Sequence, residues 1–197
     1  MIKLKNILTE ELNNFKVGNN LRGSQWLFDF IKYEEGDPKR KGEPVLTSYK
    51  NKKDPWTIGY GHTAGVTPNM TITKQKALQF MYKDLTEAAD CVRRLFVRWD
   101  KEQGLDIPIT QNMFDVLVSL VFNTGCGAML ESEFIQSVKQ KKYKQAAKDI
   151  LTYNLKSGYS GLITRRKQES TRFSVSYTHL RAHETPEHLV CRLLLEK

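Results

Sequence analysis

The sequence predicts an α+β protein in which a small antiparallel β-lobe and a larger helical lobe are joined by a long helix. Short β-branched and aromatic runs separated by glycines lie between residues 45 and 63, which is typical of strands in a small sheet. From Thr71 onward the apolar residues recur at spacings of three and four, which is typical of helices. Segregation of strands and helices along the chain favours the α+β class.

The first helix is expected to begin after Ser24, which can cap it, and to end at Gly36. Its apolar residues share one face: Leu27, Phe30 and Ile31. Glu34 and Glu35 therefore lie in its last turn. The segment DPKRKGEP that follows contains two prolines and a glycine, which indicates an inserted loop.

The β-lobe is expected over residues 37–70, from the runs VLTSYK and WTIGYGHT. The helical lobe is expected over residues 73–174. A long amphipathic helix should follow Thr73, and a second helix, apolar on nearly every face and therefore buried on all sides, should run from Thr110 to the glycines at 125 and 127. Shorter helices are predicted over residues 134–138, 143–153 and 162–173.

Composition and charge restrict the possible functions. The chain of 197 residues has a net charge of +9, which favours a polyanionic partner such as an acidic glycan, an anionic surface or nucleic acid. No apolar run reaches the roughly 18 to 20 residues that cross a bilayer, and the N-terminus lacks a secretory cleavage site. We therefore expect a protein that does not insert into membranes and is not exported by the usual route.

Both ends of the chain are set apart from the predicted domain of residues 23–174. Residues 1–22 are expected to form an arm or a short helix. Residues 175–197 resemble the translation of a sequencing adapter and are interpreted as a non-native tail. Without that tail the chain keeps His62, Cys91 and Cys126, so we expect no metal site, no disulfide scaffold, and two separated thiols suited to a reducing compartment.

Two positions could carry chemistry. At the C-terminal end of a helix the dipole should raise the pKa of Glu35, which suits a general acid, although a solvated carboxylate pair at a helix end is the alternative. In WTIGYGHT, strand alternation would place Thr57 on one face with the glycines at 59 and 61, which leaves room for a ligand near the backbone. Glycines that serve only a hairpin explain the same pattern.

The motifs YEEG, SYK and WTIGYGHT together resemble the phage-type lysozymes of glycoside hydrolase family 24. The resemblance continues through VFNTG, FIQS and GLITRR and covers about residues 24–174. It implies a lysozyme-like fold and a muramidase that hydrolyses the β-1,4 bond between N-acetylmuramic acid and N-acetylglucosamine in peptidoglycan. By resemblance Glu35 is the acid, Phe122 and Ser137 line the saccharide cleft, and no cofactor or metal is needed.

One position departs from the family pattern. In that pattern eight residues separate the catalytic Glu from an Asp or Cys, and five more residues separate this Asp or Cys from a Thr. Five residues lie between Thr57 and Asn51, so Asn51 occupies the position of the family's Asp or Cys. Fifteen residues separate Asn51 from Glu35, and the surplus of seven is about the size of the inserted loop. An amide can position water but cannot take its proton. Three interpretations remain: Asn51 and Thr57 position water at a turnover reduced by ~10²–10⁴, Asp54 substitutes as the base, or the protein binds glycan without cleaving it.

Other residues receive weaker predictions. Arg166 and Glu169 are expected either to pair across one helical turn and hold the last helix against the cleft, or to form a plain surface pair. His62 is expected to be a structural hydrogen-bonding residue. The basic runs at residues 93–94, 139–144 and 165–167 read as solvated helix faces that would concentrate the protein on an anionic wall.

The resemblance also suggests where the protein acts. It implies a monomer that waits in the host cytoplasm for a holin to open the membrane, or one that is mounted among the tail components of a virion. The competing class is a wall-binding or structural module that lost hydrolysis through Asn51. A nucleic-acid binder rests on charge alone, because no aromatic motif is interleaved with the basic runs, and nucleic acid is not the expected partner.

Overall fold

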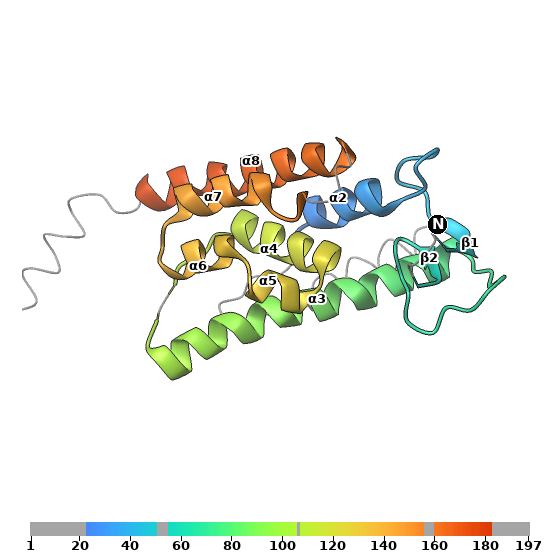
Figure 1. Ribbon diagram of the computed structural model, residues 1–197, viewed down its shortest axis with the longest axis horizontal. Helices are drawn as coiled ribbons and strands as arrows, with labels where there is room; N and C mark the ends of the chain where they lie inside the picture. The colour runs from blue at the N-terminus through green and yellow to red at the C-terminus, as the bar shows by residue number, and fades with distance from the viewer. Residues whose placement is uncertain (1–22, 51–54, 106, 156–159, 183–197) are drawn as a thin grey trace, which may run out of the picture.

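The computed structural model describes residues 23–50, 55–105, 107–155 and 160–182. Figure 1 shows the two strands at one end of the molecule, the shorter helices gathered at the other, and the long helix α3 (Lys74–Gln103) running between them. This arrangement confirms the α+β prediction.

The sheet has two antiparallel strands, β1 (Val45–Tyr49) and β2 (Thr57–Gly59). The predicted continuous alternation over WTIGYGHT is wrong beyond Gly59. Gly59 and Gly61 have φ angles of 70° and 89°, and the chain turns back so that Ile58 and His62 pair with each other. Positive φ favours glycine, so the two glycines form a tight turn in place of an extended strand.

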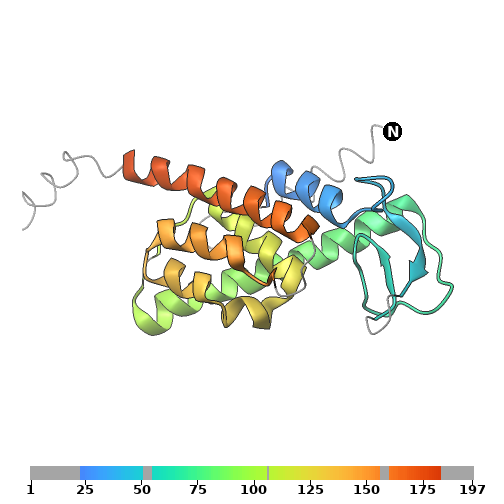
Figure 2. The same ribbon diagram turned by 45° about the horizontal axis from the view of Figure 1, so that its top comes forward.

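Helices make up the remainder. α2 (Gln25–Glu35) lies beside the last helix, α8 (Ser160–Ala182), in both views (Figures 1 and 2). α4 (Gln111–Thr124) is buried continuously from Met113 to Val121 and packs against α2, α3 and α8, as its apolar sequence predicts. The others are α5 (Cys126–Leu130), α6 (Glu133–Lys139) and α7 (Tyr143–Thr152).

The helix starts follow the predicted capping residues. The side chains of Ser24, Thr73 and Thr110 each accept a hydrogen bond from the backbone N–H three residues later. Ser24 also donates its hydroxyl to the buried Asp115 of α4, whose second carboxylate oxygen accepts from the Ser24 N–H at 3.1 Å. The start of α2 is therefore fixed to the centre of the core.

A disulfide joins Cys91 of α3 to Cys126 of α5, with the two Cα atoms 6.0 Å apart. The expectation of two separated thiols is therefore wrong. The cysteines are 35 residues apart in sequence, and only the packing of the α4–α5 turn against α3 brings them together. Sequence spacing contains no information about that contact.

The last helix is longer than predicted. α8 continues through Ala182, past residue 173, where the sequence predicted its end. Extending an existing helix costs little compared with starting one, so the first residues of the suspected tail can continue it. The rest of that tail, residues 183–197, and the arm of residues 1–22 lie outside the described residues. Within the described ranges, no helix is both long and apolar enough to cross a membrane.

Candidate active site

Glu35 is the last residue of α2, and the backbone around it is tightly packed. A Cβ at Gly36 would lie 2.8 Å from the Lys32 carbonyl oxygen and 2.9 Å from the backbone nitrogen of Gly42, so only glycine fits. The inserted loop closes on itself at this point, because the Asp37 N–H donates to the Glu43 carbonyl at 2.7 Å. The loop therefore leaves and re-enters the fold at one place, so its length need not displace the glutamate.

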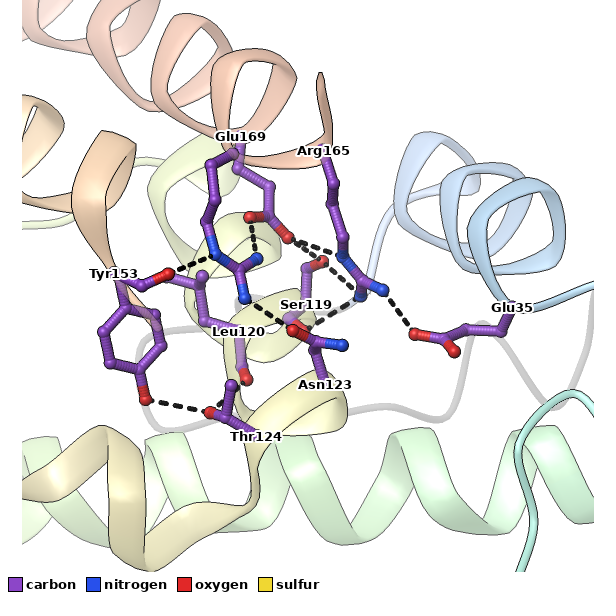
Figure 3. A network of polar contacts seen from close by, with 9 residues as sticks. Glu35, Ser119, Leu120, Asn123, Thr124, Tyr153, Arg165 and Glu169 are labelled. Atoms are coloured by element: carbon purple, nitrogen blue, oxygen red, sulfur yellow. Dashed lines mark hydrogen bonds and ion pairs between the residues drawn. The ribbon is translucent and has the colours of Figure 1, made fainter. Parts of the chain in front are cut away.

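The Glu35 carboxylate points toward α8, where Nη1 of Arg165 donates to its Oε1 (Figure 3). The Arg165 side chain is 5% exposed and that of Glu35 is 21% exposed, so the acid retains contact with solvent while its partner is buried. The helix-end argument from sequence did not include this guanidinium. The ion pair with α8 fixes where the carboxylate points.

Arg165 is itself held by a second carboxylate. Its Nε donates to Oε1 of Glu169 at 3.1 Å, and the Ser119 hydroxyl donates to the same oxygen at 2.7 Å. Glu169 is fully buried. Because each buried charge has a charged partner and further hydrogen bonds, the network is satisfied and rigid. It joins α2, α4 and α8 at the candidate acid.

The predicted pair of Arg166 and Glu169 is confirmed, and it is buried rather than on the surface. Arg166 also donates from Nε to the Tyr153 carbonyl at 3.0 Å and from Nη2 to Asn123. The interpretation of residues 165–167 as a solvated basic face is wrong for Arg165 and Arg166, which are 4% and 0% exposed. Their charges are balanced inside the protein.

Burial and charge act in opposite directions on these groups. Burial lowers the pKa of the Arg165 guanidinium, but the negative charges of Glu35 and Glu169 raise it more, so the net shift is upward. For Glu34, burial raises the pKa of the carboxyl more than the positive charges of Arg165 and Lys41 lower it. Arg165 therefore stays charged beside the candidate acid.

The turn after β2 approaches the other oxygen of Glu35. A Cβ built on Gly61 would lie 3.7 Å from Oε2, so the bare backbone of this turn faces the carboxylate. Thr57 begins β2, on the strand that leads into the same turn, and its hydroxyl donates to the Pro55 carbonyl at 3.0 Å. With its proton used in that bond, the hydroxyl oxygen can accept a hydrogen bond from water. Asn51 and Asp54 lie outside the described residues.

A groove of about 490 Å³ is lined by the turn after β2, including Gly61, by one face of α3 and by the α4–α5 turn. Phe122 is one of its lining residues, as the resemblance implies. Ser137 is not among the described residues that line it. The Ser137 hydroxyl instead donates to Asp149 at 2.6 Å and joins α6 to α7.

His62 has the structural role expected from sequence. Its Nδ1 lies 2.8 Å from Oδ2 of Asp84, and its ring stacks on Phe80 with centroids 4.2 Å apart. Burial raises the pKa of Asp84 more than its hydrogen bond to His62 lowers it. The pair attaches the turn after β2 to α3. Within the described ranges, no group of three or more His, Cys, Asp or Glu side chains is placed to hold a metal ion.

Sequence reasoning missed several residues of this site. The sequence assigns no site contact to Arg165 beyond its place in a basic run and in GLITRR, and it assigns none to Ser119 or Asn123. Arg165 and Glu169 are spaced i, i+4, which was a usable signal for a helical ion pair. Ser119 and Asn123 had no signal of their own, because their partners lie 50 and 43 residues away in sequence.

A two-stranded sheet joined by a long helix to a helical lobe, with a carboxylate held by a buried ion network beside a glycine turn, defines the class as lysozyme-like. Comparisons with known proteins identify the family. The Phage lysozyme family model matches residues 42–169, and this chain belongs to that family. Glu35 precedes the matched range.

The chain is also similar to individual phage endolysins and to a muramidase domain. The endolysin of Bacillus phage B103 is 36% identical over 121 residues, covering 60% of this chain and 43% of the relative. The endolysin of Salmonella phage P22 is 32% identical over 142 residues, covering 68% of this chain and 90% of the relative. The muramidase domain of SpmX from Asticaccaulis excentricus has a TM-score of 0.63 at 26% identity, covering 78% of this chain and 97% of that domain. The chain spans less than half the length of the Bacillus phage relatives.

Proposed function

We propose that this protein is a muramidase that hydrolyses the β-1,4 bond between N-acetylmuramic acid and N-acetylglucosamine in peptidoglycan. The observation that carries the proposal is the position of Glu35, which Arg165 holds through Oε1 and whose Oε2 faces Gly61, one of the residues that line the groove. Membership of the phage lysozyme family and similarity to endolysins and a muramidase domain support it. Residues 23–174 would form the catalytic domain.

In the proposed reaction Glu35 protonates the glycosidic oxygen. Arginine can only donate hydrogen bonds, so the oxygen bound to Arg165 is already used as an acceptor and the proton is carried on Oε2. Oε2 is also the oxygen that faces the turn after β2. Proton transfer to the leaving oxygen therefore takes place on the groove side of the carboxyl.

Water attacks the opposite face of the sugar from the side of Thr57. The Thr57 hydroxyl accepts a hydrogen bond from this water while it donates to Pro55. Inversion requires ~6.5–9.5 Å between the acid and the group on the water side, which leaves room for the water. Asn51 or Asp54 supplies the second contact with the water, and only a carboxylate at that place could also take its proton.

The proposal includes how the protein meets its substrate. The protein acts as a monomer on the bacterial cell wall, which it reaches from the host cytoplasm once a holin opens the membrane. A position among virion tail components is the alternative. The net charge of +9 favours accumulation on an anionic wall.

The test is turbidity loss of purified peptidoglycan with Glu35→Gln and a matched control, Glu34→Gln. Both variants replace one carboxyl by an amide in the same helical turn. We expect Glu35→Gln to lose roughly 10²–10⁴-fold in rate, and Glu34→Gln to retain most of the activity. Equal losses in both variants, with both folded by circular dichroism, would contradict the assignment. A wild type that binds peptidoglycan without clearing it would instead indicate a wall-binding module.

The water side is tested separately. Asn51→Asp should raise turnover by up to ~10²–10⁴-fold if the natural residue only positions water. Asp54→Asn should have little effect in that case and should abolish activity if Asp54 is the base. The two variants therefore discriminate between the two interpretations.

A further inference from the structure

The turn between α6 and α7 carries a basic surface away from the groove. Residues 139–148 contain five lysines and no aspartate or glutamate. Four of these lysines are exposed, and the half-buried Lys139 places its ammonium 5.9 Å from the centroid of the Trp99 ring of α3. We name the five residues the lysine surface: Lys139, Lys141, Lys142, Lys144 and Lys148.

Hydrogen bonds fix the backbone of this turn. The N–H of Lys141 donates to the Val138 carbonyl at 2.9 Å, and the N–H of Lys142 donates to the Ser137 carbonyl at 2.8 Å. Both acceptors belong to α6, so the turn is closed onto the helix that precedes it. The positions from which these two lysine side chains extend are therefore defined.

α7 presents further lysines to solvent. Its opposite face is buried in the core, and the hydroxyl of the buried Tyr143 donates to the Pro108 carbonyl at 2.6 Å. Lys144 and Lys148 are both exposed and one helical turn apart, so their Cβ atoms are about 5–6 Å from each other. The lysine surface is thus a row of positive charges on a fixed scaffold.

The charge of this surface is not neutralised within the described part of the chain. Lys141, Lys142 and Lys148 form no ion pair with any described carboxylate. The neighbouring carboxylate, Asp149, instead accepts hydrogen bonds at 2.6 Å from Ser137 and from the Gln145 side chain. The surface therefore attracts an external polyanion.

We propose that the lysine surface binds an anionic polymer of the cell wall that carries phosphodiester groups in its backbone. That the polymer belongs to the wall rests on the proposed function. A lysine ammonium binds phosphate as a point charge, whereas paired recognition of a carboxylate favours arginine, which this surface lacks. A flexible polymer with one charge in each repeat can place successive phosphates along the row of lysines.

The observations favour this polymer over two other polyanions. Single-stranded nucleic acids stack their bases on exposed aromatic side chains, but Tyr143, the one aromatic residue in 139–148, is only 6% exposed. Helices that bind a membrane surface insert apolar side chains, and no residue of 139–148 is an exposed large hydrophobic one. The surface offers charge alone, which suits a hydrated polymer without bases or acyl chains.

The lysine surface and the reaction centre lie at different ends of the molecule. In both views the α6–α7 turn is at the end away from β1 and β2 (Figures 1 and 2), whereas Glu35 lies at the end of α2 that leads into β1. The surface therefore retains the protein on the wall without contacting the bond that is cleaved. Its loss should reduce action on whole walls and leave cleavage of short fragments unchanged.

The direct test measures binding of the full chain to lipid-free poly(glycerol phosphate). Replacing Lys141, Lys142 and Lys148 together by Gln should weaken binding roughly 3- to 100-fold and reduce its dependence on salt. Replacing the same three residues by Arg should retain most of the affinity. The matched control replaces three exposed lysines of other segments by Gln, lowers the net charge equally and should retain the affinity: Lys39, Lys83 and Lys167.

A second measurement uses hydrolysis. The Lys141, Lys142, Lys148 triple Gln variant should clear polymer-bearing walls more slowly than the wild type. It should match the wild type on the same walls after hydrofluoric acid has removed the polymer, and on short soluble glycan fragments. If the wild type cleaves no wall at all, the proposed function fails, and the binding measurement still decides whether the lysine surface binds the polymer.

Four results would overturn the inference. They are unchanged binding in the triple Gln variant, an equal loss in the control, an equal loss in the Arg variant, and tighter binding of the wild type to another polyanion than to poly(glycerol phosphate) at equal charge concentration. The competing polyanions are single-stranded DNA and vesicles of phosphatidylglycerol. Preference for either one would make nucleic acid or a membrane the partner of this surface.

Discussion

Removing the bond between Cys91 and Cys126 should destabilise the protein by an amount that follows from its place in the chain. The bond closes a loop of 35 residues. In the chain-entropy model such a cross-link lowers the entropy of the unfolded chain enough to contribute about 4 kcal/mol at 25 °C. For a protein of this size each kcal/mol changes Tm by about 2–4 °C, so the expected loss is about 8–16 °C.

The assay is thermal unfolding followed by circular dichroism, with and without a dithiol reductant. All proteins carry Cys191→Ser, because this third cysteine, outside the described residues, could exchange with the disulfide. Reductant should lower the Tm of this parent protein by the stated amount. It should not change the Tm of a Cys91→Ala, Cys126→Ala variant, which should unfold near the temperature of the reduced parent.

Thiol titration in denaturant decides how a negative result is read. If the oxidised protein shows no free thiols but reductant changes Tm by less than about 2 °C, the loop-entropy reasoning is refuted. If two thiols titrate under oxidising conditions, the disulfide itself is absent, and the original expectation of separated thiols would be restored.

Three further substitutions test the buried polar groups. Glu169→Gln leaves two buried guanidinium groups short of one negative charge and should cost about 3–5 kcal/mol in urea unfolding. The control Glu133→Gln, at an exposed residue in the first turn of α6, should cost only about 0.3–1 kcal/mol. A cost below about 1 kcal/mol for Glu169→Gln would contradict the buried network. Burial raises the pKa of the Asp115 carboxyl in the folded state. The contribution of this carboxyl to the free energy of unfolding is therefore largest at low pH and is lost as the pH rises through the raised pKa. The free energy of unfolding measured across pH should fall in this way in the wild type and not in Asp115→Asn. Burial raises the pKa of the Tyr60 hydroxyl to about 12, so the wild type should lose stability as the pH rises above 10. Tyr60→Phe should remove this loss. At pH 7 the same variant should cost about 1 kcal/mol, because it lacks the hydrogen bond that the Tyr60 hydroxyl donates to the Gly42 carbonyl.

The features that the sequence predicted correctly are local. The capping roles of Ser24, Thr73 and Thr110 depend on a hydrogen bond that spans three residues, and the buried character of α4 follows from its own apolar composition. The overall division into a β-lobe and a helical lobe follows in the same way from the change in hydrophobic period. The expectation that failed locally, a strand continuing past Gly59, did so because glycine permits both an extended strand and a turn.

The site could be predicted only in part, because its contacts span long stretches of sequence. Glu35 was selected by motif, but its partner Arg165 is 130 residues away, and a basic run normally faces solvent. The burial of Arg165 and Arg166 becomes favourable only when Glu169, Glu35 and Ser119 surround them. Pairing of Cys91 with Cys126 likewise depends on helix packing.

The two sides of the proposed reaction centre are held by different parts of the helical lobe. α8 and α4 fix Glu35, through Arg165 and the residues around it (Figure 3). α3 fixes the turn after β2, because Asp84 holds His62, and a Cβ at Gly59 would lie 3.4 Å from that of Ala77. A two-stranded sheet is marginally stable by itself, so the turn depends on these contacts for its position. The distance across the groove is therefore set by how α3 packs on α4 and α8, and the cross-link from α3 to the α4–α5 turn stabilises that packing on the groove side. Changes far from Glu35 that shift α3 relative to α4 should for this reason alter catalysis without touching the acid.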